Sequence, residues 1–306
     1  MSQTTSDILM IRPTHFAFNE ETAGNNEFQT RDAGLENVQK KAVKEFNAMV
    51  ELLKSMGVRV HVVQDSSIPI KPDAVFANNW LSTYSDNTLI TWPMYAPNRR
   101  VERRDKIVEH LGKMFHIDQT IHYERYESEH IFVEGTGSLV LDRENKIAYA
   151  CLSDRTHNAL ISVFCEDMGY TSVVFHALDQ QQKSIYHTNV MMSIGEKVAV
   201  VCSESILDES REKVLENLRN SGKEILDISF EQMCHFAGNM LELKSADGQA
   251  LMVLSQTARS SLNKDQLALL EKHCALVIPE IPVIETIGGG SVRCMMCEIF
   301  LAPRFS

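Results

Sequence analysis

Two patterns of apolar residues alternate along this 306-residue chain: stretches in which they recur every three or four positions, and short runs in which they are nearly continuous. Residues three and four apart lie on one face of a helix. The positions with this spacing are Val43, Phe46, Val50 and Leu53 in one stretch, and Ile107, Leu111 and Met114 in another. We therefore expect amphipathic helices in both stretches, with the apolar faces packed on a core.

Three of the helical stretches end at a glycine, Gly57, Gly169 or Gly222, and a short apolar run begins within two residues of each. Glycine suits the left-handed backbone conformation that commonly ends a helix. The runs read "VRVHVV", "TSVVFHA" and "EILDIS", and their β-branched residues are typical of short strands.

Four further segments begin with a small or polar cluster and continue as two strand-like runs around a turn. They read "FANNWLSTYSDNTLITWP", "EGTGSLVLDRENKIAYACLS", "HTNVMMSIGEKVAVVCS" and "AGNMLELKSADGQALMVLS", and a fifth related segment is "GGGSVRCMMCEIFLAP". Turn residues such as "SDN", "DREN", "GE" and "ADG" mark where four of the chain segments reverse. The markers Asn78, Gly135, His187, Gly238 and Gly289 are 57, 52, 51 and 51 residues apart. A step this regular indicates an internal repeat.

The repeated unit is a hairpin, a helix and a strand, and it recurs about five times. The N-terminal strand "ILMIRP" and the helix after it complete a unit whose hairpin lies at the C-terminus, so the two ends of the chain together close a ring. No Pro/Ser-rich linker or low-complexity tract interrupts the series, and we predict a single α/β domain over residues 1–306. A doubly wound α/β sheet is the alternative fold, but it does not account for a hairpin in every unit.

The composition of the chain limits the classes of partner that it can bind. The chain is 44% hydrophobic, which is enough to bury a substantial core, and its net charge of −11 repels phosphate backbones and anionic lipid surfaces. We expect no nucleic-acid partner. We also expect no membrane association and a cytoplasmic location, because no apolar stretch approaches roughly 18 residues and the first residues lack a signal-peptide pattern. The chain has seven cysteines, an odd number, and their spacing does not match that of a disulfide framework, so we expect reduced thiols rather than disulfides.

If the units surround a common axis, the equivalent clusters at the heads of the hairpins meet at one mouth of the ring. Their polar members are Asp73, Asn78 and Asn79, then Glu134, then His187 and Asn189, then Asn239, and finally Cys294. An imidazole can help a thiol to ionise or can act as acid and base, and a carboxylate can hold the imidazole in one tautomer. Cys294, His187 and Glu134 fit these roles. The glycines at 288–290 allow the backbone to approach a substrate closely.

Cys294 and Cys297 form a Cys-x-x-Cys pair, a spacing that also serves zinc binding and disulfide exchange. A zinc site takes four ligands, and no second pair follows at finger-like spacing, so we expect no metal. A thioredoxin-like pair opens a helix, whereas "SVRCMMCEIF" reads as a strand, which disfavours a redox role.

Six segments resemble those of the pentein superfamily of guanidino-group-modifying enzymes, which includes arginine deiminase, dimethylarginine dimethylaminohydrolase and the amidinotransferases. They are "IRPTHFAFNEETAGNNEFQ", "PDAVFANNW", "EGTGSLVLD", "YHTNVMMSIG", "AGNML" and "GGGSVRCMMC", and together they span nearly the whole chain. The resemblance is nearest to the citrulline-utilisation hydrolases. It implies a five-bladed α/β propeller that uses no cofactor and acts on a small amino-acid-like substrate.

The resemblance also implies individual roles. The nucleophile of arginine deiminases is the first cysteine of a "CMTC"-like ending, which corresponds to Cys294 and leaves Cys297 as a bystander. The histidine of the family's His-x-Asp motif corresponds to His187, and the glutamate of its Glu-Gly-Gly-Asp motif corresponds to Glu134. Arg155, in "LSDRTHNAL", resembles an arginine that holds the substrate's carboxylate.

The chain departs from the family pattern where aspartates are expected: Gly137 replaces one in the glutamate motif, and Asn79 and Asn189 replace two on the substrate side. A guanidinium is a cation that offers only donors, whereas asparagine offers one acceptor, two donors and no charge, which suits a neutral ureido group. Asp73 restores one carboxylate if it points inward.

We therefore predict a hydrolase that cleaves a carbon–nitrogen bond of a ureido or guanidino substrate, with citrulline as the leading candidate, through a covalent S-carbamoyl or amidino intermediate on Cys294. An amidinotransferase or an arginine deiminase-type enzyme is an alternative within the same chemistry. A non-catalytic propeller scaffold is the alternative from another class.

Overall fold

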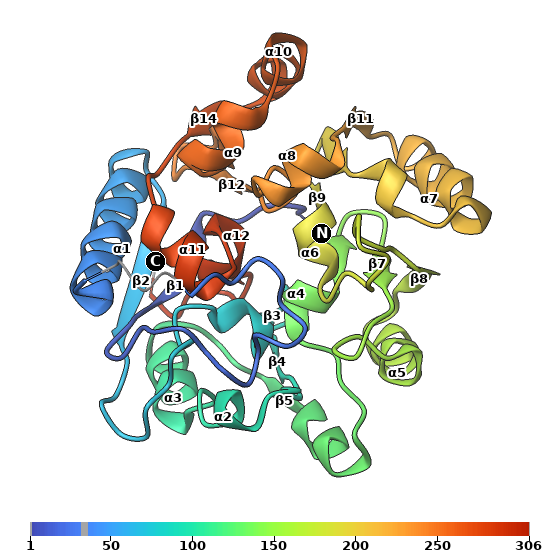
Figure 1. The fold of residues 1–306 in the computed structure, drawn as a ribbon. Helices are drawn as coiled ribbons and strands as arrows, with labels where there is room; N and C mark the ends of the chain where they lie inside the picture. Colours follow the sequence, from blue (N-terminus) through green and yellow to red (C-terminus); the bar gives the residue numbers. More distant parts are fainter. Residues whose placement is uncertain (1, 32–35, 306) are drawn as a thin grey trace.

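The computed structural model describes residues 2–31 and 36–305, and within them the strands form five sheets of three strands each (Figure 1). In every sheet two antiparallel strands are followed by a third strand that is parallel to the middle one. Four sheets are continuous in sequence: β3 (Leu81–Thr83), β4 (Thr88–Thr91) and β5 (Gln119–His122); β6 (Val140–Asp142), β7 (Ile147–Cys151) and β8 (Thr171–Phe175); β9 (Met192–Ile194), β10 (Val198–Val201) and β11 (Glu224–Asp227); β12 (Leu241–Lys244), β13 (Ala250–Val253) and β14 (Ala275–Val277).

The fifth sheet joins the two ends of the chain. Its strands are β15 (Cys297–Ile299), β1 (Asp7–Arg12) and β2 (Arg59–Gln64), and Asp7 lies opposite Ile299 in an antiparallel pair. The first strands of neighbouring sheets lie side by side, β15 with β3, β6 with β9 and β9 with β12. The predicted unit, and the prediction that the N- and C-terminal segments share one unit, are confirmed. The five sheets fit a pseudo-fivefold arrangement.

A helix connects the second and third strands of each sheet, and Figure 1 places these helices around the outside. They are α1 (Val38–Ser55), α3 (Asp105–Met114), α5 (Asn158–Met168), α7 (Asp208–Asn220) and α10 (Lys264–His273). Phe46 and Leu53 on α1 and Leu111 on α3 are buried, as the spacing predicts. Gly57, Gly169 and Gly222 have positive φ angles, so each of the three glycines ends its helix in the left-handed conformation.

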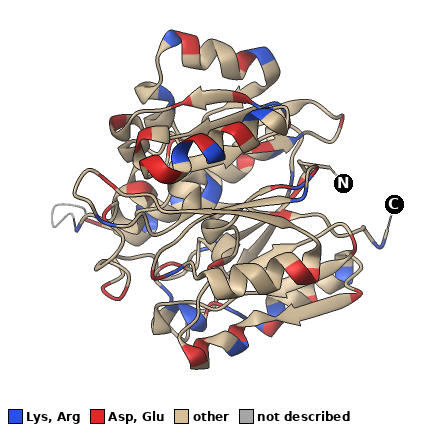
Figure 2. Ribbon diagram, turned by 90° about the vertical axis from the view of Figure 1, so that its right-hand side faces the viewer, with Lys and Arg blue, Asp and Glu red and all other residues tan. Residues whose placement is uncertain are grey.

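Charged residues of both signs lie along the outer helices (Figure 2). No helix in residues 2–31 and 36–305 is long and apolar enough to cross a membrane. The remaining helices are short: η1 (Ala77–Asn79), α2 (Pro97–Arg100), η2 (Tyr123–Glu129), α4 (Gly135–Ser138), α6 (Thr188–Met191), η3 (Ser203–Ser205), α8 (Phe230–Cys234), α9 (Gln256–Ser261), α11 (Pro282–Gly288) and α12 (Val292–Met295).

Four of these short helices, η1, α4, α6 and α12, immediately precede the first strand of a sheet, and they contact one another near the middle of the fold (Figure 1). The prediction of a strand throughout "SVRCMMCEIF" is therefore wrong in its first half: Cys294 lies in α12, and β15 begins at Cys297. A helical turn and a strand are told apart in a sequence by the spacing of their polar, solvent-facing residues. Every residue from 291 to 299 is buried, so this segment has no such spacing.

Candidate active site

A small cavity of about 20 Å³ lies where η1 meets α12, and His187, the residue before α6, also lines it. This volume holds about one water molecule. Five of the predicted site residues line it: Asp73, Asn79, Arg155, His187 and Cys294. The other two adjoin it, because Glu134 contacts the His187 ring and Asn189 contacts the Cys294 sulfur. The remaining lining residues are Thr22, Asn26, Phe76, Arg99, Tyr186 and the glycines at 288–290.

Cys294 is 5% exposed, and two side-chain amides donate to its sulfur. The Nδ2 of Asn239 lies 3.3 Å from Sγ, and the Nδ2 of Asn189 lies 3.5 Å from it. Burial raises the pKa of the Cys294 thiol, while the Asn239 amide and the charge of Arg293 act in the opposite direction. The thiol is therefore neutral at rest, with donors already aimed at the position where a thiolate charge would develop.

His187 lies next to Glu134, with Nε2 2.8 Å from Oε2. Burial lowers the pKa of His187 to about 4, although the Glu134 carboxylate opposes this effect. The imidazole is thus neutral near pH 7. Because an ionised carboxylate can only accept, Nε2 carries the proton and Nδ1 is left as the basic nitrogen. This is the tautomer-holding arrangement that the sequence predicts for a carboxylate and an imidazole.

Glu134 is fully buried, and it is ionised despite that burial. The backbone N–H of Tyr95 donates to Oε1 at 2.8 Å, and the guanidinium of Arg155 lies 3.6 Å from Oε2. Burial alone raises the pKa of a carboxyl, but the charge of Arg155 and the His187 hydrogen bond outweigh it and lower the pKa of Glu134 to about 2.

The glycine at 137 has a steric explanation. A Cβ at this position would lie 2.4 Å from Nδ2 of Asn79 and 2.9 Å from Nδ1 of His187. Both distances are too short for a real contact. An aspartate at this position is therefore incompatible with the present placement of the Asn79 amide and the imidazole.

Asp73 and Asn79 form a polar wall together with Arg99, which sequence reasoning does not identify. The NH1 of Arg99 donates to Oδ1 of Asn79 at 2.9 Å, and its Nε lies 3.8 Å from Oδ2 of Asp73. Asn19 donates to the same Asp73 oxygen at 2.7 Å. Burial raises the pKa of Asp73, against the charge of Arg99.

Three polar atoms of this region are buried without a hydrogen-bond partner among the described residues: Oδ1 of Asp73, Nδ2 of Asn79 and Oδ1 of Asn189. Unsatisfied buried polar groups are costly, and they are commonly found where a ligand or water completes the site. Here they supply two acceptors and one donor.

Arg99 is 3% exposed and forms a bidentate pair with Glu102, with both N–O distances 2.9 Å. In sequence it stands in "PNRRVERR", which reads as a solvated charged surface. The only sequence signal for burial is the i,i+3 spacing of the two residues, which is too common to be diagnostic. Asn239, by contrast, heads a hairpin equivalent to the others, and that equivalence is the signal that locates it.

Arg155 is 2% exposed, and its guanidinium is held by the N-terminal segment. It donates to Oδ1 of Asn25 and to the carbonyl of Thr22, and it stacks over the Tyr186 ring at 4.9 Å. Residues 22–25 therefore occupy the donors that the resemblance assigns to a substrate carboxylate.

Residues 12–301 match the family model described as N,N dimethylarginine dimethylhydrolase, eukaryotic. The chain belongs to this family. It is accordingly a C–N hydrolase of the pentein superfamily. No curated protein sequence matches it.

Solved structures give the same fold. ArgZ, an arginine dihydrolase from the ornithine–ammonia cycle in cyanobacteria, matches with a TM-score of 0.72 and 16% identity over 97% of this chain, which spans 41% of the ArgZ chain. The substrate-bound N-terminal domain of ArgZ matches over 96% of this chain and 99% of its own, with a TM-score of 0.71 and 15% identity. An adduct of dimethylarginine dimethylaminohydrolase with S-methyl-L-thiocitrulline matches over 96% and 99%, with a TM-score of 0.67 and 16% identity.

Proposed function

We propose that the protein hydrolyses a carbon–nitrogen bond in the guanidino group of an amino-acid-like substrate, with Cys294 as nucleophile, and that its five sheets are the blades of a propeller around this site. The observation that carries the proposal is that a buried thiol and a neutral, carboxylate-held imidazole line one cavity in a chain of this family. We expect it to act in the cytoplasm, where thiols remain reduced.

The reaction has two halves. Nδ1 of His187 takes the thiol proton as Sγ of Cys294 bonds to the central guanidino carbon, and it passes that proton to the leaving nitrogen as the C–N bond breaks. Water then attacks the same carbon and gives a proton to Nδ1. As the C–S bond breaks to release the product, Nδ1 returns that proton to Sγ, which restores the neutral thiol and imidazole. In both halves the Glu134 carboxylate accepts the hydrogen bond from Nε2–H, because an ionised carboxylate can only accept. The basic nitrogen, Nδ1, therefore faces away from Glu134.

The family favours an arginine-like guanidinium as the substrate, and Asp73 supports this choice. Its Oδ1 is buried, unpartnered among the described residues and part of the cavity wall. A guanidinium would donate to this oxygen and supply the positive charge that a buried carboxylate needs. Arg155 would hold the substrate's carboxylate after exchanging its present partners at 22–25.

Citrulline is the second candidate, and one observation favours it. Within the described part of the chain, Asn79 presents an unpartnered Nδ2 donor and Asn189 an unpartnered Oδ1 acceptor. A neutral ureido group, with a carbonyl and amide N–H groups, satisfies such a pair without added charge.

The test is product analysis by mass spectrometry after incubation with arginine, N,N-dimethylarginine, agmatine and citrulline at equal concentrations. We expect conversion of a guanidino compound, loss of turnover by Cys294→Ala, and retained turnover by Cys297→Ala, a matched buried cysteine. Faster conversion of citrulline than of every guanidino compound would select the second candidate, and Asn79→Asp should then shift the preference toward arginine.

Trapping separates hydrolysis from amidino transfer and from a non-catalytic scaffold. Acid quenching during turnover should leave a single adduct located at Cys294 by peptide mapping. Product that contains an added amine in place of water identifies an amidinotransferase. Turnover by Cys294→Ala, or no conversion of any of the four compounds, contradicts the assignment.

A further inference from the structure

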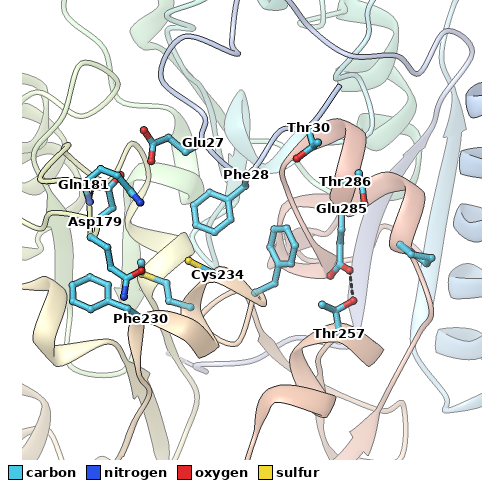
Figure 3. Close-up of a pocket in the computed structure, with 14 residues that line it drawn as sticks. Glu27, Phe28, Thr30, Asp179, Gln181, Phe230, Cys234, Thr257, Glu285 and Thr286 are labelled. Atoms are coloured by element: carbon cyan, nitrogen blue, oxygen red, sulfur yellow. Dashed lines mark hydrogen bonds between the residues drawn. The ribbon is translucent and has the colours of Figure 1, made fainter. Parts of the chain in front are cut away.

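A second cavity, much larger than the one that contains Cys294, lies beside the N-terminal segment. It has a volume of about 660 Å³ and lies among the 26–30 segment, the loop at 179–181, α8, α9 and α11 (Figure 3). This volume is within the range of small-molecule sites, whereas the inner cavity of about 20 Å³ is not. We call it the outer cavity.

The two cavities share a wall, because the 26–30 segment lines both. Asn26 lines the inner cavity and donates to the Gly288 carbonyl at 3.4 Å. Phe28 and Thr30 line the outer cavity, and the Thr30 N–H is bonded to the Thr286 carbonyl at 2.7 Å. A ligand in the outer cavity would therefore touch the segment that covers the candidate active site.

Three phenylalanine rings contribute to the wall of the outer cavity. Phe28, Phe230 and Phe236 line it, with the rings of Phe28 and Phe236 5.5 Å apart. Phe28 also lies edge-on to Tyr186, a residue of the inner cavity, at 6.2 Å. Aromatic faces attract cations, and the attraction strengthens where water is partly excluded.

The charges of the outer cavity are all of one sign. Among its described lining residues the ionisable carboxylates are Glu27, Asp179 and Glu285, and no lysine, arginine or histidine is present. Figure 3 shows Glu27 and Asp179 on one side and Glu285 on the other, with Phe28 between them. Glu27 is paired with Lys183 outside the cavity, whereas Asp179 has no basic partner among the described residues.

We propose that the outer cavity binds an organic cation, a guanidinium or ammonium compound, and that the substrate occupies it before it passes the 26–30 segment to reach Cys294. The second half of this proposal rests on the proposed function. The first half rests on the volume, the rings and the one-sided charge alone. Apolar walls whose charged residues are all acidic repel anions, and a net-neutral amino acid gains less than a cation because its own carboxylate is repelled.

Cys234 makes the binding half measurable, since it is exposed and lines the cavity. The full chain is treated at low salt with two methanethiosulfonate reagents, one bearing a trimethylammonium group and the other a sulfonate, and modification of Cys234 is followed by peptide mass spectrometry. Rates are normalised to those of a small neutral thiol. We expect the cationic reagent to be favoured by about tenfold or more, and less so as salt is added. Equal normalised rates would overturn the proposal.

Ligand protection then tests the chemical class. L-arginine should slow modification of Cys234, and the neutral citrulline should not. Asp179→Asn keeps an oxygen for the backbone N–H groups of 181 and 183, so the turn is preserved, and it should weaken both the protection and the reagent preference. Glu51→Gln, on the exposed side of α1, is the matched control and should change neither.

A second variant guards against a local folding defect in the first. Phe230→Leu removes a ring but no charge, and it should weaken arginine protection while leaving most of the reagent preference intact. Protection by citrulline equal to that by arginine, or protection unaltered in both variants, contradicts an organic-cation site. Labelling of Cys234 needs no turnover. A protein without hydrolase activity can therefore still show the organic-cation site, and an active hydrolase can lack it, so the two proposals fail separately.

Discussion

The buried histidine makes a prediction about acid stability. His187 is 3% exposed, its pKa in the folded protein is about 4, and the ordinary value is 6.5. Below pH 6.5 the unfolded chain therefore binds a proton at this residue that the folded protein does not bind until about pH 4. Protons thus favour unfolding in this window, and the histidine's contribution to stability is present above pH 6.5 and is lost as the pH falls toward 4.

The magnitude follows from the same two values. Their difference of about 2.5 corresponds to about 3 kcal/mol, at about 1.4 kcal/mol for each pH unit within the window. Replacement by glutamine removes the titration and keeps a donor for Glu134. We expect the free energy of unfolding of wild type to fall by about 3 kcal/mol more than that of His187→Gln between pH 7 and pH 4.

Urea denaturation followed by circular dichroism at half-unit pH intervals measures this difference. The absolute stability of the variant is immaterial, because only the difference in pH dependence is used. His110→Gln, at an exposed position of α3, is the matched control for loss of a histidine. If the wild-type and His187→Gln curves stay parallel within about 1 kcal/mol, the imidazole is not held neutral by burial, and its assignment as a proton acceptor loses its basis.

Three other predictions follow from the site. Gly137→Ala should lower stability by about 1–3 kcal/mol in thermal unfolding and reduce turnover, because the added Cβ overlaps the Asn79 amide and the His187 imidazole. Gly112→Ala is the control: its Cβ would have its nearest contact at 3.7 Å, and it should stabilise the protein by about 0.5–1 kcal/mol. Arg99→Met should cost about 3–5 kcal/mol in urea denaturation by leaving Glu102 buried without its partner, and adding Glu102→Met should recover much of that loss. Alkylation of Cys294 by iodoacetamide should still be accelerating at pH 9, since burial raises the pKa of the thiol, and a plateau below pH 8 would contradict this.

The fold was predictable because its information is local and repeated. Each hairpin has its own turn residues, each outer helix has one apolar stripe, and the left-handed glycines, Gly57 among them, mark where helices end. The repeat supplies the long-range information, since equivalence of the hairpin heads brings Glu134, His187 and Cys294 together from the sequence alone.

What sequence reasoning missed depends on contacts between distant segments. Arg99 reads as a surface arginine, and it is buried because it pairs with Glu102 and also donates to Asn79, twenty residues earlier in the chain. The helical turn at Cys294 was missed because its residues are all buried. The polar stretch around Asn25 and Asn26 gave no sign that it closes the cavity, since the hydrogen bonds of these two side chains are to residues far away in the chain.

The protonation states also bear on the choice of substrate. At rest Cys294 is a neutral thiol and His187 a neutral imidazole, so the free protein holds neither a nucleophile nor an acid in its reactive form. A guanidinium beside the sulfur supplies the charge that stabilises a thiolate, whereas a ureido group supplies none. When a small cationic guanidino ligand is bound, alkylation of Cys294 should therefore proceed at lower pH than in the free protein. Bound citrulline should leave the pH dependence of alkylation unchanged. That asymmetry is the physical reason for placing the guanidino substrate ahead of the ureido one, despite the two asparagines.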